Sequence, residues 1–368
     1  MTTTEPVGAV GTLLPSVSPL ALLRADGTAV PDTPLTLPDD GILLDLYRGM
    51  VVGRRFDIQA TALTKQGRLA VYPSSRGQEA CQVGAVAALG EDDWLFPTYR
   101  DSVAVMTRGV DTVATLTLFR GDWHLGYDPQ AHRVAPQCTP LATNTLHAVG
   151  LARAAVLKGE STVALVMLGD GATSEGDTHE ALNFAAVWQA PVVFLVQNNG
   201  YAISVPTAVQ SAAPSLAHKG IGYGIPSVLV DGNDAAAVHA VVNEAVTAAR
   251  TGAGPVLVEA RTYRTEPHTN ADDDSRYRDA AEVEHWRARD PLERLERHLT
   301  AHGLLDDVRR KAVHEEGEVL AADLRTRMNR DRTADPTSLF TDVYAEPTAA
   351  LREQLADLVS RERAGEDL

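Results

Sequence analysis

Two short apolar runs, each ended by a polar turn, stand out in the hydrophobic pattern of the chain. Residues 163–168 form the first run and end in Gly-Asp-Gly, and residues 191–196 form the second and end just before an Asn-Asn pair. Short β-branched runs bounded by turn residues predict buried parallel strands. Residues 177–189 between them carry apolar positions at helical spacing. The pattern therefore predicts a strand–helix–strand unit.

Similar patterns extend this unit on both sides. Apolar runs at residues 227–230 and 255–260 predict two more strands, with a helix at residues 235–250 between them. Helical patterns also cover residues 39–63, 80–89 and 142–157. Strands that alternate with helices predict an α/β fold: a doubly wound, mainly parallel sheet with helices on both faces.

Composition and hydrophobic periodicity divide the chain into three regions. Residues 1–38 are rich in Pro, Thr and Gly without a sustained period, which favours an extended or partly disordered N-terminal arm, or one laid over a partner. Residues 39–280 hold the α/β pattern. Residues 281–368 are helical and rich in charge, and we expect this C-terminal helical region to pack on the same domain or on a partner.

Composition limits the partners and the compartment. The net charge of −16 over 368 residues argues against nucleic acid and anionic membranes as partners. Two cysteines in so long a chain do not form a disulfide framework, so we expect a reducing, cytoplasmic location. The chain contains no run of 18 apolar residues, so the sequence predicts no membrane-spanning helix.

The polar residues at the strand ends predict a metal and phosphate site. Asp170 and Asn199 follow two strands of one unit, and ligands of open parallel sheets bind outside the carboxyl ends of the strands. A carboxylate and an amide oxygen suit Mg²⁺, whose shell phosphate oxygens would complete. Gly169 and Gly171 would let backbone N–H groups approach a phosphate closely.

Gly-Asp-Gly and Asn-Asn, separated by residues 172–197, resemble the cofactor motif of thiamine-diphosphate enzymes. The stretch at residues 94–101, which includes Tyr99-Arg100, sharpens this resemblance. From about residue 40 to residue 357 the chain resembles the alpha subunit of the decarboxylating component of 2-oxo acid dehydrogenase complexes. The resemblance implies the thiamine-diphosphate-binding fold, with thiamine diphosphate and Mg²⁺ as cofactors.

The resemblance also assigns roles to individual residues. It implies that Asp170, Asn199 and Tyr201 bind the metal. His268, in a long polar loop, would lie by the diphosphate and serve as a catalytic residue that helps to pass the acyl group on. The cofactor-binding positions are Tyr99, Arg100, Thr139, Leu141, Gly169, Asp170, Gly171, Ala172, Asn199, Tyr201 and His268.

The sequence departs from relatives at several positions near these residues. Cys138 and Asn144 replace the Ser and Gln of members that hold a monovalent cation, which puts that cation in doubt. Gln197 stands where some branched-chain members carry an arginine. Thr269 stands where mammalian members carry a regulatory phosphoserine. For Arg100, the residues alone leave open a surface pairing with Asp101 or Asp122.

The chain does not clearly supply the glutamate that activates the aminopyrimidine of the cofactor. Glu79 and Glu175 are the nearest candidates by sequence, and neither lies where a base is expected. In the family this glutamate comes from a separate beta subunit. The resemblance therefore implies an α₂β₂ heterotetramer, a small 2-oxo acid substrate, and acyl transfer to a lipoyl-bearing acyltransferase.

The sequence leaves alternatives open for the substrate and for the activity of the chain. Residues 230–234 and 339–344 are similar to the branched-chain (3-methyl-2-oxobutanoate) type, while pyruvate or acetoin remains the alternative substrate. A non-catalytic cofactor-binding paralogue is a second hypothesis, because the base is missing. A nicotinamide-dependent dehydrogenase is a third, which the lack of a G-x-G-x-x-G motif after a strand disfavours.

Overall fold

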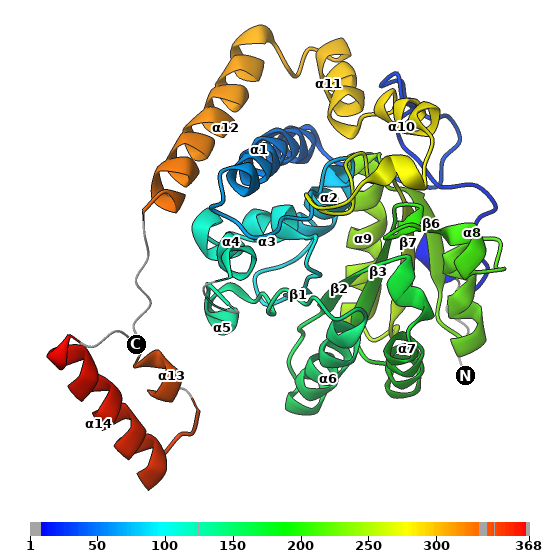
Figure 1. Cartoon of the computed structure of the whole chain (residues 1–368). Coiled ribbons are helices and arrows are strands. Elements are labelled where there is room, and N and C mark those ends of the chain that lie inside the picture. Colours follow the sequence, from blue (N-terminus) through cyan, green and yellow to red (C-terminus); the bar gives the residue numbers. More distant parts are fainter. Residues whose placement is uncertain (1–8, 122, 124, 331–336, 342, 366–368) are drawn as a thin grey trace. The chain divides into compact units, whose positions relative to one another are not determined.

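A parallel five-stranded sheet forms the centre of the larger of two units, Met1–Arg327 (Figure 1). The computed structural model describes residues 9–121, 123, 125–330, 337–341 and 343–365. The strands lie in the order β1 (Trp94–Phe96), β2 (Ala164–Gly169), β3 (Val192–Asn198), β7 (Val256–Arg261) and β6 (Ser227–Asp231). The four predicted strands are confirmed, and each neighbouring pair is parallel. The sequence pattern did not reveal β1, which is three residues long.

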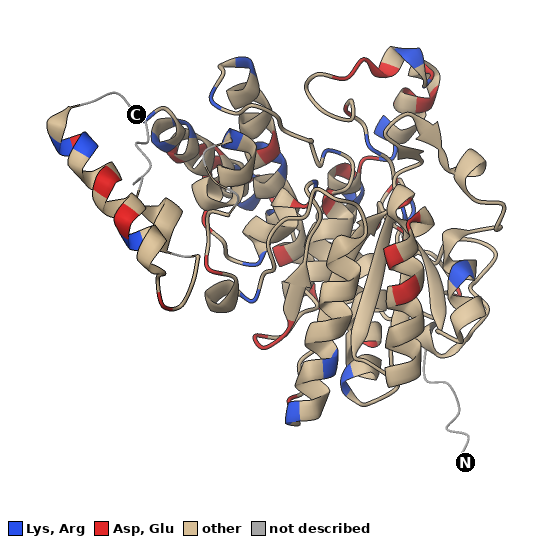
Figure 2. Ribbon diagram, turned by 60° about the horizontal axis from the view of Figure 1, so that its bottom comes forward, with Lys and Arg blue, Asp and Glu red and all other residues tan. Residues whose placement is uncertain are grey.

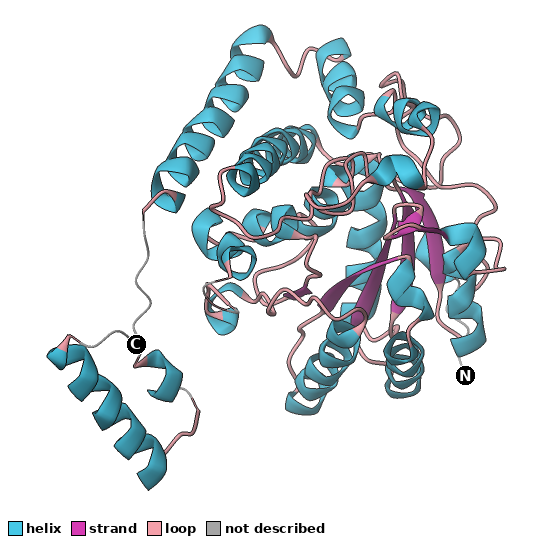
Figure 3. Cartoon of the chain, in the orientation of Figure 1, coloured by secondary structure: helices cyan, strands magenta, loops and turns pink. Residues whose placement is uncertain are grey.

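Strand order explains why helices cover both faces of the sheet. From β1 to β3 the chain moves across the sheet in one direction, through α6 (Thr143–Lys158) and α7 (Gly176–Trp188). From β6 to β7 it moves back in the other direction, through α9 (Ala235–Arg250). Because parallel crossovers are right-handed, a reversal of direction puts the connecting helix on the opposite face. The doubly wound prediction is confirmed, and Figure 3 shows the strands enclosed by helices.

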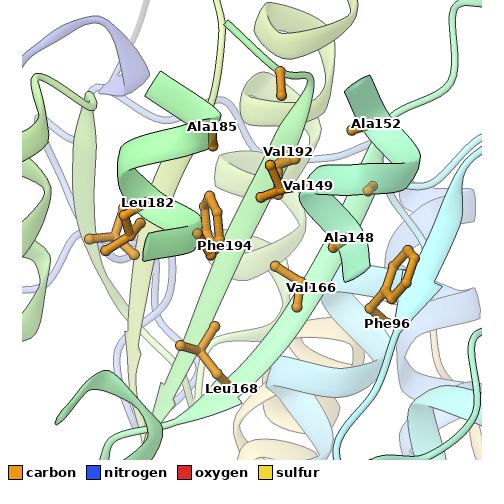
Figure 4. Close-up of a cluster of buried hydrophobic side chains, with 14 of the residues drawn as sticks. Phe96, Ala148, Val149, Ala152, Val166, Leu168, Leu182, Ala185, Val192 and Phe194 are labelled. Atoms are coloured by element: carbon orange, nitrogen blue, oxygen red, sulfur yellow. The ribbon is translucent and has the colours of Figure 1, made fainter. Parts of the chain in front are cut away.

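One hydrophobic cluster joins α6 and α7 to the sheet (Figure 4). Side chains of a strand alternate between its faces, so Val166 and Leu168 face this cluster together with Phe194 of the next strand. Phe194 is fully buried, and burying such a side chain stabilises the fold by about 1.5–3 kcal/mol. Ala148 and Ala152 present small side chains to the same cluster, which lets α6 approach the strands closely.

The remaining elements surround this centre. The helices are α1 (Asp40–Lys65), α2 (Glu79–Val86), α3 (Ser102–Thr107), α4 (Thr112–Arg120), α5 (Pro129–His132), α8 (Thr207–Gln210), α10 (Ala280–Arg287), α11 (Pro291–Ala301) and α12 (Asp307–Met328). A short antiparallel pair, β4 (Tyr201–Ala202) and β5 (Val205–Pro206), follows β3. Charged residues are spread over the helices and loops, whereas β1, β2 and β3 carry none (Figure 2).

A largely buried arginine, with a side chain that is 15% exposed, connects three of these helices. Arg54 of α1 donates to Glu79 of α2 at 2.7 Å and to Asp290, which caps α11, at 2.6 Å. Glu79 is fully buried and also accepts the backbone N–H of Gly77. Buried charges are tolerated when they are paired and hydrogen-bonded, so this cluster fixes the turn that precedes α2.

The described part of the N-terminal arm, from residue 9, packs on its own chain. Leu20 forms a parallel bridge with Val230 at the β6 edge of the sheet. The backbone N–H groups of Leu22 and Leu23 donate to Asp234 Oδ2 at 2.8 and 2.6 Å, while Oδ1 of the same carboxylate caps α9. A buried carboxylate thus holds the arm against the start of α9. The predicted boundaries at residues 38 and 280 remain a proposal, since the larger unit extends to Arg327.

The second unit, Met328–Leu368, contains α13 (Ser338–Thr341) and α14 (Ala349–Ala364). Thr348 caps α14 by accepting the backbone N–H of Leu351, and Gly365 ends the helix with φ 71°. Positive φ favours glycine, so the helix ends where the sequence places one. Within the described parts of both units, no helix combines the length and apolar character needed to span a bilayer.

Candidate active site

A cavity of about 500 Å³ opens at the carboxyl ends of the central strands. The loops after β1, β2, β3 and β7 all contribute to its lining, as expected for an open parallel sheet. All eleven predicted cofactor-binding residues line it. They are Tyr99, Arg100, Thr139, Leu141, Gly169, Asp170, Gly171, Ala172, Asn199, Tyr201 and His268. The structure thus brings together residues that lie up to 169 positions apart in the sequence, from Tyr99 to His268.

Asp170 and Asn199 contribute side-chain oxygen atoms to the lining of this cavity. Asp170 follows β2 and is almost fully buried, and its Oδ2 accepts hydrogen bonds from Gln210 Nε2 at 2.9 Å and Thr207 Oγ1 at 3.3 Å. Burial raises the pKa of the Asp170 carboxyl, and the hydrogen bond from Gln210 acts in the opposite direction. Asn199 Nδ2 donates to Gln78 Oε1 at 3.1 Å, which fixes the amide orientation and leaves Oδ1 as an acceptor.

Tyr201 is placed beside these two residues but its hydroxyl is engaged elsewhere. The hydroxyl donates to Glu282 of α10 at 2.8 Å. Burial, followed by the neighbouring Glu282 carboxylate, raises the pKa of Tyr201 above its usual value. The backbone N–H of Tyr201 donates to Asn199 Oδ1 at 3.2 Å. Any contribution of Tyr201 to a metal would therefore come from its backbone carbonyl rather than its side chain.

Two arginines and a histidine form a positively charged cluster in the lining of the cavity. Arg100 donates to His268 Nδ1 at 2.9 Å and to the His268 carbonyl at 3.0 Å. Arg264 also reaches His268 Nδ1, at 3.2 Å. Desolvation, reinforced by Arg100 and Arg264, lowers the pKa of His268 to about 4. Because guanidinium groups only donate, Nδ1 must be the acceptor, so neutral His268 carries its proton on Nε2.

Arg264 is a lining residue that sequence reasoning missed. It is 1% exposed, yet it lines the cavity, and it donates to the Ile203 carbonyl and the Tyr277 hydroxyl, both at 2.9 Å. Its position three residues after a buried strand, and four residues before His268, was the available signal. Ile203 has φ 56°, which is rare for a β-branched residue, so the contact from Arg264 helps to hold a strained turn.

Arg100 is oriented from the other side by a loop that a buried aspartate holds. Its second guanidinium nitrogen donates to the Ser74 carbonyl at 2.9 Å. Asp57 of α1 accepts hydrogen bonds from Tyr72, from the Ser74 hydroxyl and from the Ser75 backbone N–H. Burial raises the pKa of Asp57 to about 6. The guanidinium therefore faces His268 and Ser74, and the described residues show no ion pair between Arg100 and Asp101. Asp122 lies outside the described residues.

Gln197 belongs to a buried network of amides in the lining of the cavity. It donates to Asp101 at 2.7 Å and accepts from Gln78 at 3.1 Å. Gln78 in turn accepts from Asn199, so this network links the end of β3 to the turn before α2. Gln197 is thus fully engaged with neutral and acidic partners of its own chain.

The loop at residues 138–144, where the sequence puts a monovalent cation in doubt, is held by the amide of Asn144. Asn144 Nδ2 lies 2.8 Å from the Met167 carbonyl and 3.2 Å from the Phe96 carbonyl, so it ties the start of α6 to β1 and β2. Cys138 Sγ contacts the Pro140 carbonyl at 3.1 Å. The side chain of Asn144 therefore acts here as a donor to backbone carbonyls.

The cavity contains one acidic residue, Asp170, among its described lining residues. Glu79 is engaged with Arg54 and Gly77, and Glu175 is exposed outside the cavity. The described residues also contain no group of three or more His, Cys, Asp or Glu side chains that could hold a metal without help from a ligand. The apolar lining residues include Val71, Leu118, Phe119, Leu141 and Ile203.

Comparisons with known proteins place this geometry in a family context. Residues 47–332 match the family described as dehydrogenase E1 component. The chain is 46% identical over 344 residues to the 3-methyl-2-oxobutanoate dehydrogenase subunit alpha of Mycobacterium tuberculosis, covering 93% of this chain and 94% of that protein. It is 37% identical over 323 residues to the pyruvate dehydrogenase E1 component subunit alpha of Staphylococcus aureus, covering 86% and 87%. The corresponding Acholeplasma laidlawii protein is 35% identical over 317 residues, covering 85% and 91%.

Proposed function

Because this chain belongs to the dehydrogenase E1 component family, we propose that it is the alpha subunit of a branched-chain 2-oxo acid dehydrogenase. The reaction is the oxidative decarboxylation of a 2-oxo acid, dependent on thiamine diphosphate and Mg²⁺, with transfer of the acyl group to a lipoyl domain. The observation that carries this proposal is the convergence of the Asp170–Asn199 pair and the Arg100–Arg264–His268 cluster on one cavity.

The residues present fit the two cofactors. Two guanidinium groups that both contact His268 suit a diphosphate, since arginine binds phosphate oxygens through paired N–H groups. Asp170 and Asn199 offer the hard oxygen ligands that Mg²⁺ prefers, with the carbonyl of Tyr201 as a third candidate. Gly171 allows the close approach of the chain here, because a Cβ at this position would lie 2.7 Å from Ala202 Cβ. When bound, thiamine diphosphate supplies the electron sink that decarboxylation requires.

The chain's own residues would anchor, orient and move protons. Arg100 and Arg264 would bind the diphosphate, and the apolar lining residues would limit the access of water to the bound cofactor. His268 keeps a proton on Nε2 while both guanidinium groups contact Nδ1. A neutral imidazole held in one tautomer donates a hydrogen bond from Nε2 at a defined position, and Nε2 can transfer a proton once the ring is protonated. We assign this role to His268 in the transfer of the acyl group.

A beta subunit completes the site in this proposal. Asp170 is the only acidic side chain among the described lining residues, and none of them is a glutamate. In this proposal, the glutamate that activates the aminopyrimidine therefore comes from another chain. Leu141 and Ile203 line the cavity and are 41% and 56% exposed, which suits a surface that a partner covers. An α₂β₂ assembly in the cytoplasm, serving a lipoyl-bearing acyltransferase, fits these observations.

The substrate is proposed as a branched-chain 2-oxo acid. The 46% identity to a 3-methyl-2-oxobutanoate dehydrogenase subunit exceeds the 37% identity to a pyruvate dehydrogenase subunit. The apolar side chains of Val71, Leu118 and Phe119 also suit an aliphatic acyl chain. Pyruvate is the second candidate substrate, because the similarity to pyruvate dehydrogenase subunits also covers most of this chain.

The proposal is tested by Asp170→Ala in the enzyme assembled with its beta subunit. We expect decarboxylation of 2-oxoisovalerate to fall by at least a hundredfold, because the variant loses the one anionic oxygen ligand of the proposed metal. Asp177→Ala, an acidic residue on α7 outside the cavity, is the control for effects of net charge. Full activity in Asp170→Ala would refute the proposed site.

His268→Asn gives a second test, because it separates two steps. We expect the acyl transfer to a lipoyl domain to fall more than the decarboxylation followed with an artificial electron acceptor. The measurement compares both rates in the same preparation. Equal losses in the two assays would contradict the proton-transfer role and leave His268 as an anchor for the diphosphate.

A further inference from the structure

A short hairpin and helix fold back over the Gly169–Ala172 loop. The hairpin pairs Ala202 with Val205, and α8 follows it directly. The backbone N–H of Thr207 donates to the Gly200 carbonyl at 2.9 Å, which closes this segment into a compact loop. The segment approaches Gly171 so closely that a Cβ there would meet Ala202 at 2.7 Å. Side chains of α8 are therefore brought within reach of Asp170.

Gln210, the last residue of α8, makes the shortest side-chain contact with the Asp170 carboxylate. Its Nε2 donates to Asp170 Oδ2 at 2.9 Å and to the Val205 carbonyl at 3.0 Å. An amide nitrogen has two hydrogens, so both bonds form together. The contact to Val205 fixes the amide against the hairpin, and the contact to Asp170 fixes the rotation of the carboxylate.

Thr207 adds a weaker contact to the same oxygen. Its hydroxyl lies 3.3 Å from Asp170 Oδ2 and 3.1 Å from Asn198 Oδ1. A hydroxyl has a single hydrogen, so it can donate to only one of these two acceptors at a time. Gln210 is therefore the main donor, and Thr207 a secondary one.

The chemistry of the donor suits a cation site. Both hydrogen bonds fall on Oδ2, so a cation bound through Oδ1 would leave both intact. Gln210 is neutral, so it orients the carboxylate without cancelling its charge. A lysine or arginine in the same place would compete with the cation.

We propose that Gln210 is a positioning residue that orients Asp170 for the divalent cation, with Thr207 in a supporting role. This inference rests on the function proposed above, since it assumes that Asp170 binds the metal. Partners that orient a metal-binding carboxylate typically change metal affinity by about 10–100-fold when they are removed. The hydrogen bond also identifies α8 as part of the metal site, although it lies outside the motif that marks the ligands.

The test measures the binding of Mn²⁺, as a substitute for Mg²⁺, to the assembled enzyme by electron paramagnetic resonance with saturating thiamine diphosphate. Gln210→Met keeps the length of the side chain and removes the donor. We expect its Kd for Mn²⁺ to rise at least about tenfold. We also expect kcat with 2-oxoisovalerate to recover at saturating Mg²⁺, because Asp170 itself remains.

Three further variants make the result interpretable. Val209→Ala, an exposed neighbour on α8, controls for disturbance of the helix and should leave the Kd unchanged. Thr207→Val should raise the Kd by a smaller factor, and it provides a second test should Gln210→Met fail to assemble. Asp170→Asn should abolish the tight binding of Mn²⁺.

The outcomes separate this inference from the function it rests on. An unchanged Kd in Gln210→Met, together with loss of binding in Asp170→Asn, would overturn the role of Gln210 alone. An unchanged Kd in Asp170→Asn would instead refute the proposed metal site. A lowered kcat at saturating Mg²⁺, with an unchanged Kd, would make Gln210 part of the active-site shape and would also overturn its proposed role.

Discussion

His268 is surrounded by positive charge, and its protonation state follows from that. Arg100 and Arg264 both contact Nδ1, and Asp272 accepts the backbone N–H of His268 at 2.8 Å. Desolvation and the two guanidinium groups outweigh this nearby carboxylate and lower the pKa of the imidazole to about 4. The cofactor-free subunit therefore holds a neutral histidine next to two cations, which is a site that favours an anion.

We expect His268 to titrate near pH 4 in the cofactor-free enzyme and at a higher pH when thiamine diphosphate is bound. The bound diphosphate would add negative charge beside the ring and so favour the imidazolium form. Histidine NMR spectra of wild type and His268→Asn, recorded from pH 4 to 8, would identify the resonance. A pKa near 6.5 without cofactor would contradict the geometry.

The same shift makes a prediction for stability with a definite sign. The folded pKa lies below the unfolded value of 6.5, so the unfolded chain binds the proton more tightly. The contribution of His268 to stability is therefore complete above pH 6.5 and is lost as the pH falls towards 4. The stability difference between wild type and His268→Asn, followed by thermal unfolding, should narrow over this interval. A stability difference that stays constant from pH 6.5 to pH 4 would contradict the lowered pKa of His268.

Arg264 should contribute to cofactor binding as strongly as the recognised motif residues. Hydrogen bonds to charged groups are worth about 1.5–3 kcal/mol, so we expect Arg264→Gln to weaken thiamine diphosphate binding by about 10–100-fold. Fluorescence quenching of the assembled enzyme measures this affinity. Arg261→Gln, an exposed arginine at the end of the same strand, is the matched control. Equal affinities in both variants would exclude a role for Arg264 in anchoring the cofactor.

At the scale of the elements, the loop after β6 has a different role from the loops after the other strands of the sheet. The loops after β1, β2, β3 and β7 line the cavity, whereas the loop after β6 holds the N-terminal arm through Asp234. Asp234 is buried, and desolvation raises the pKa of its carboxyl. One carboxylate thus joins residues 22 and 23 to the first turn of α9.

Asp234→Asn should release the arm. In the variant, the amide nitrogen replaces one carboxylate oxygen, so its N–H groups would face at least one backbone N–H donor of Leu22, Leu23 or Ala237. That backbone donor would lose its acceptor, and an unsatisfied buried donor costs about 1–3 kcal/mol. We expect faster proteolytic cleavage within residues 9–38 and a lower Tm. Asp32→Asn, at an exposed turn of the arm, should change neither. A protease-resistant arm in Asp234→Asn would contradict the anchoring role.

The long elements could be predicted from the sequence because their periodicity is strong. The runs at residues 163–168 and 191–196 became β2 and β3, and the helical pattern at residues 235–250 became α9 with the same bounds. The short elements could not be predicted in this way. β1 and α8 are only three and four residues long, and their conformations depend on the neighbours they pair with.

At the scale of the whole molecule, the candidate site was predictable where a motif marks it. The strand-end residues Asp170 and Asn199 and the loop residue His268 line the predicted cavity. Arg264 and Gln210 were not predicted, because nothing in the sequence distinguishes an arginine or glutamine that points towards the site from one that points into solvent. Their roles depend on the folding of two separate loops against the motif.

The central claim is that this chain provides one part of an active site for branched-chain 2-oxo acids. The most direct measurement is decarboxylation by this chain with and without its beta subunit, in the presence of thiamine diphosphate, Mg²⁺ and an artificial electron acceptor. Equal concentrations of 2-oxoisovalerate and pyruvate would be compared. We predict turnover only in the assembled enzyme, with a clear preference for 2-oxoisovalerate. A preference for pyruvate would contradict the proposed substrate, and no turnover of either by the assembled, cofactor-bound enzyme would contradict the claim as a whole.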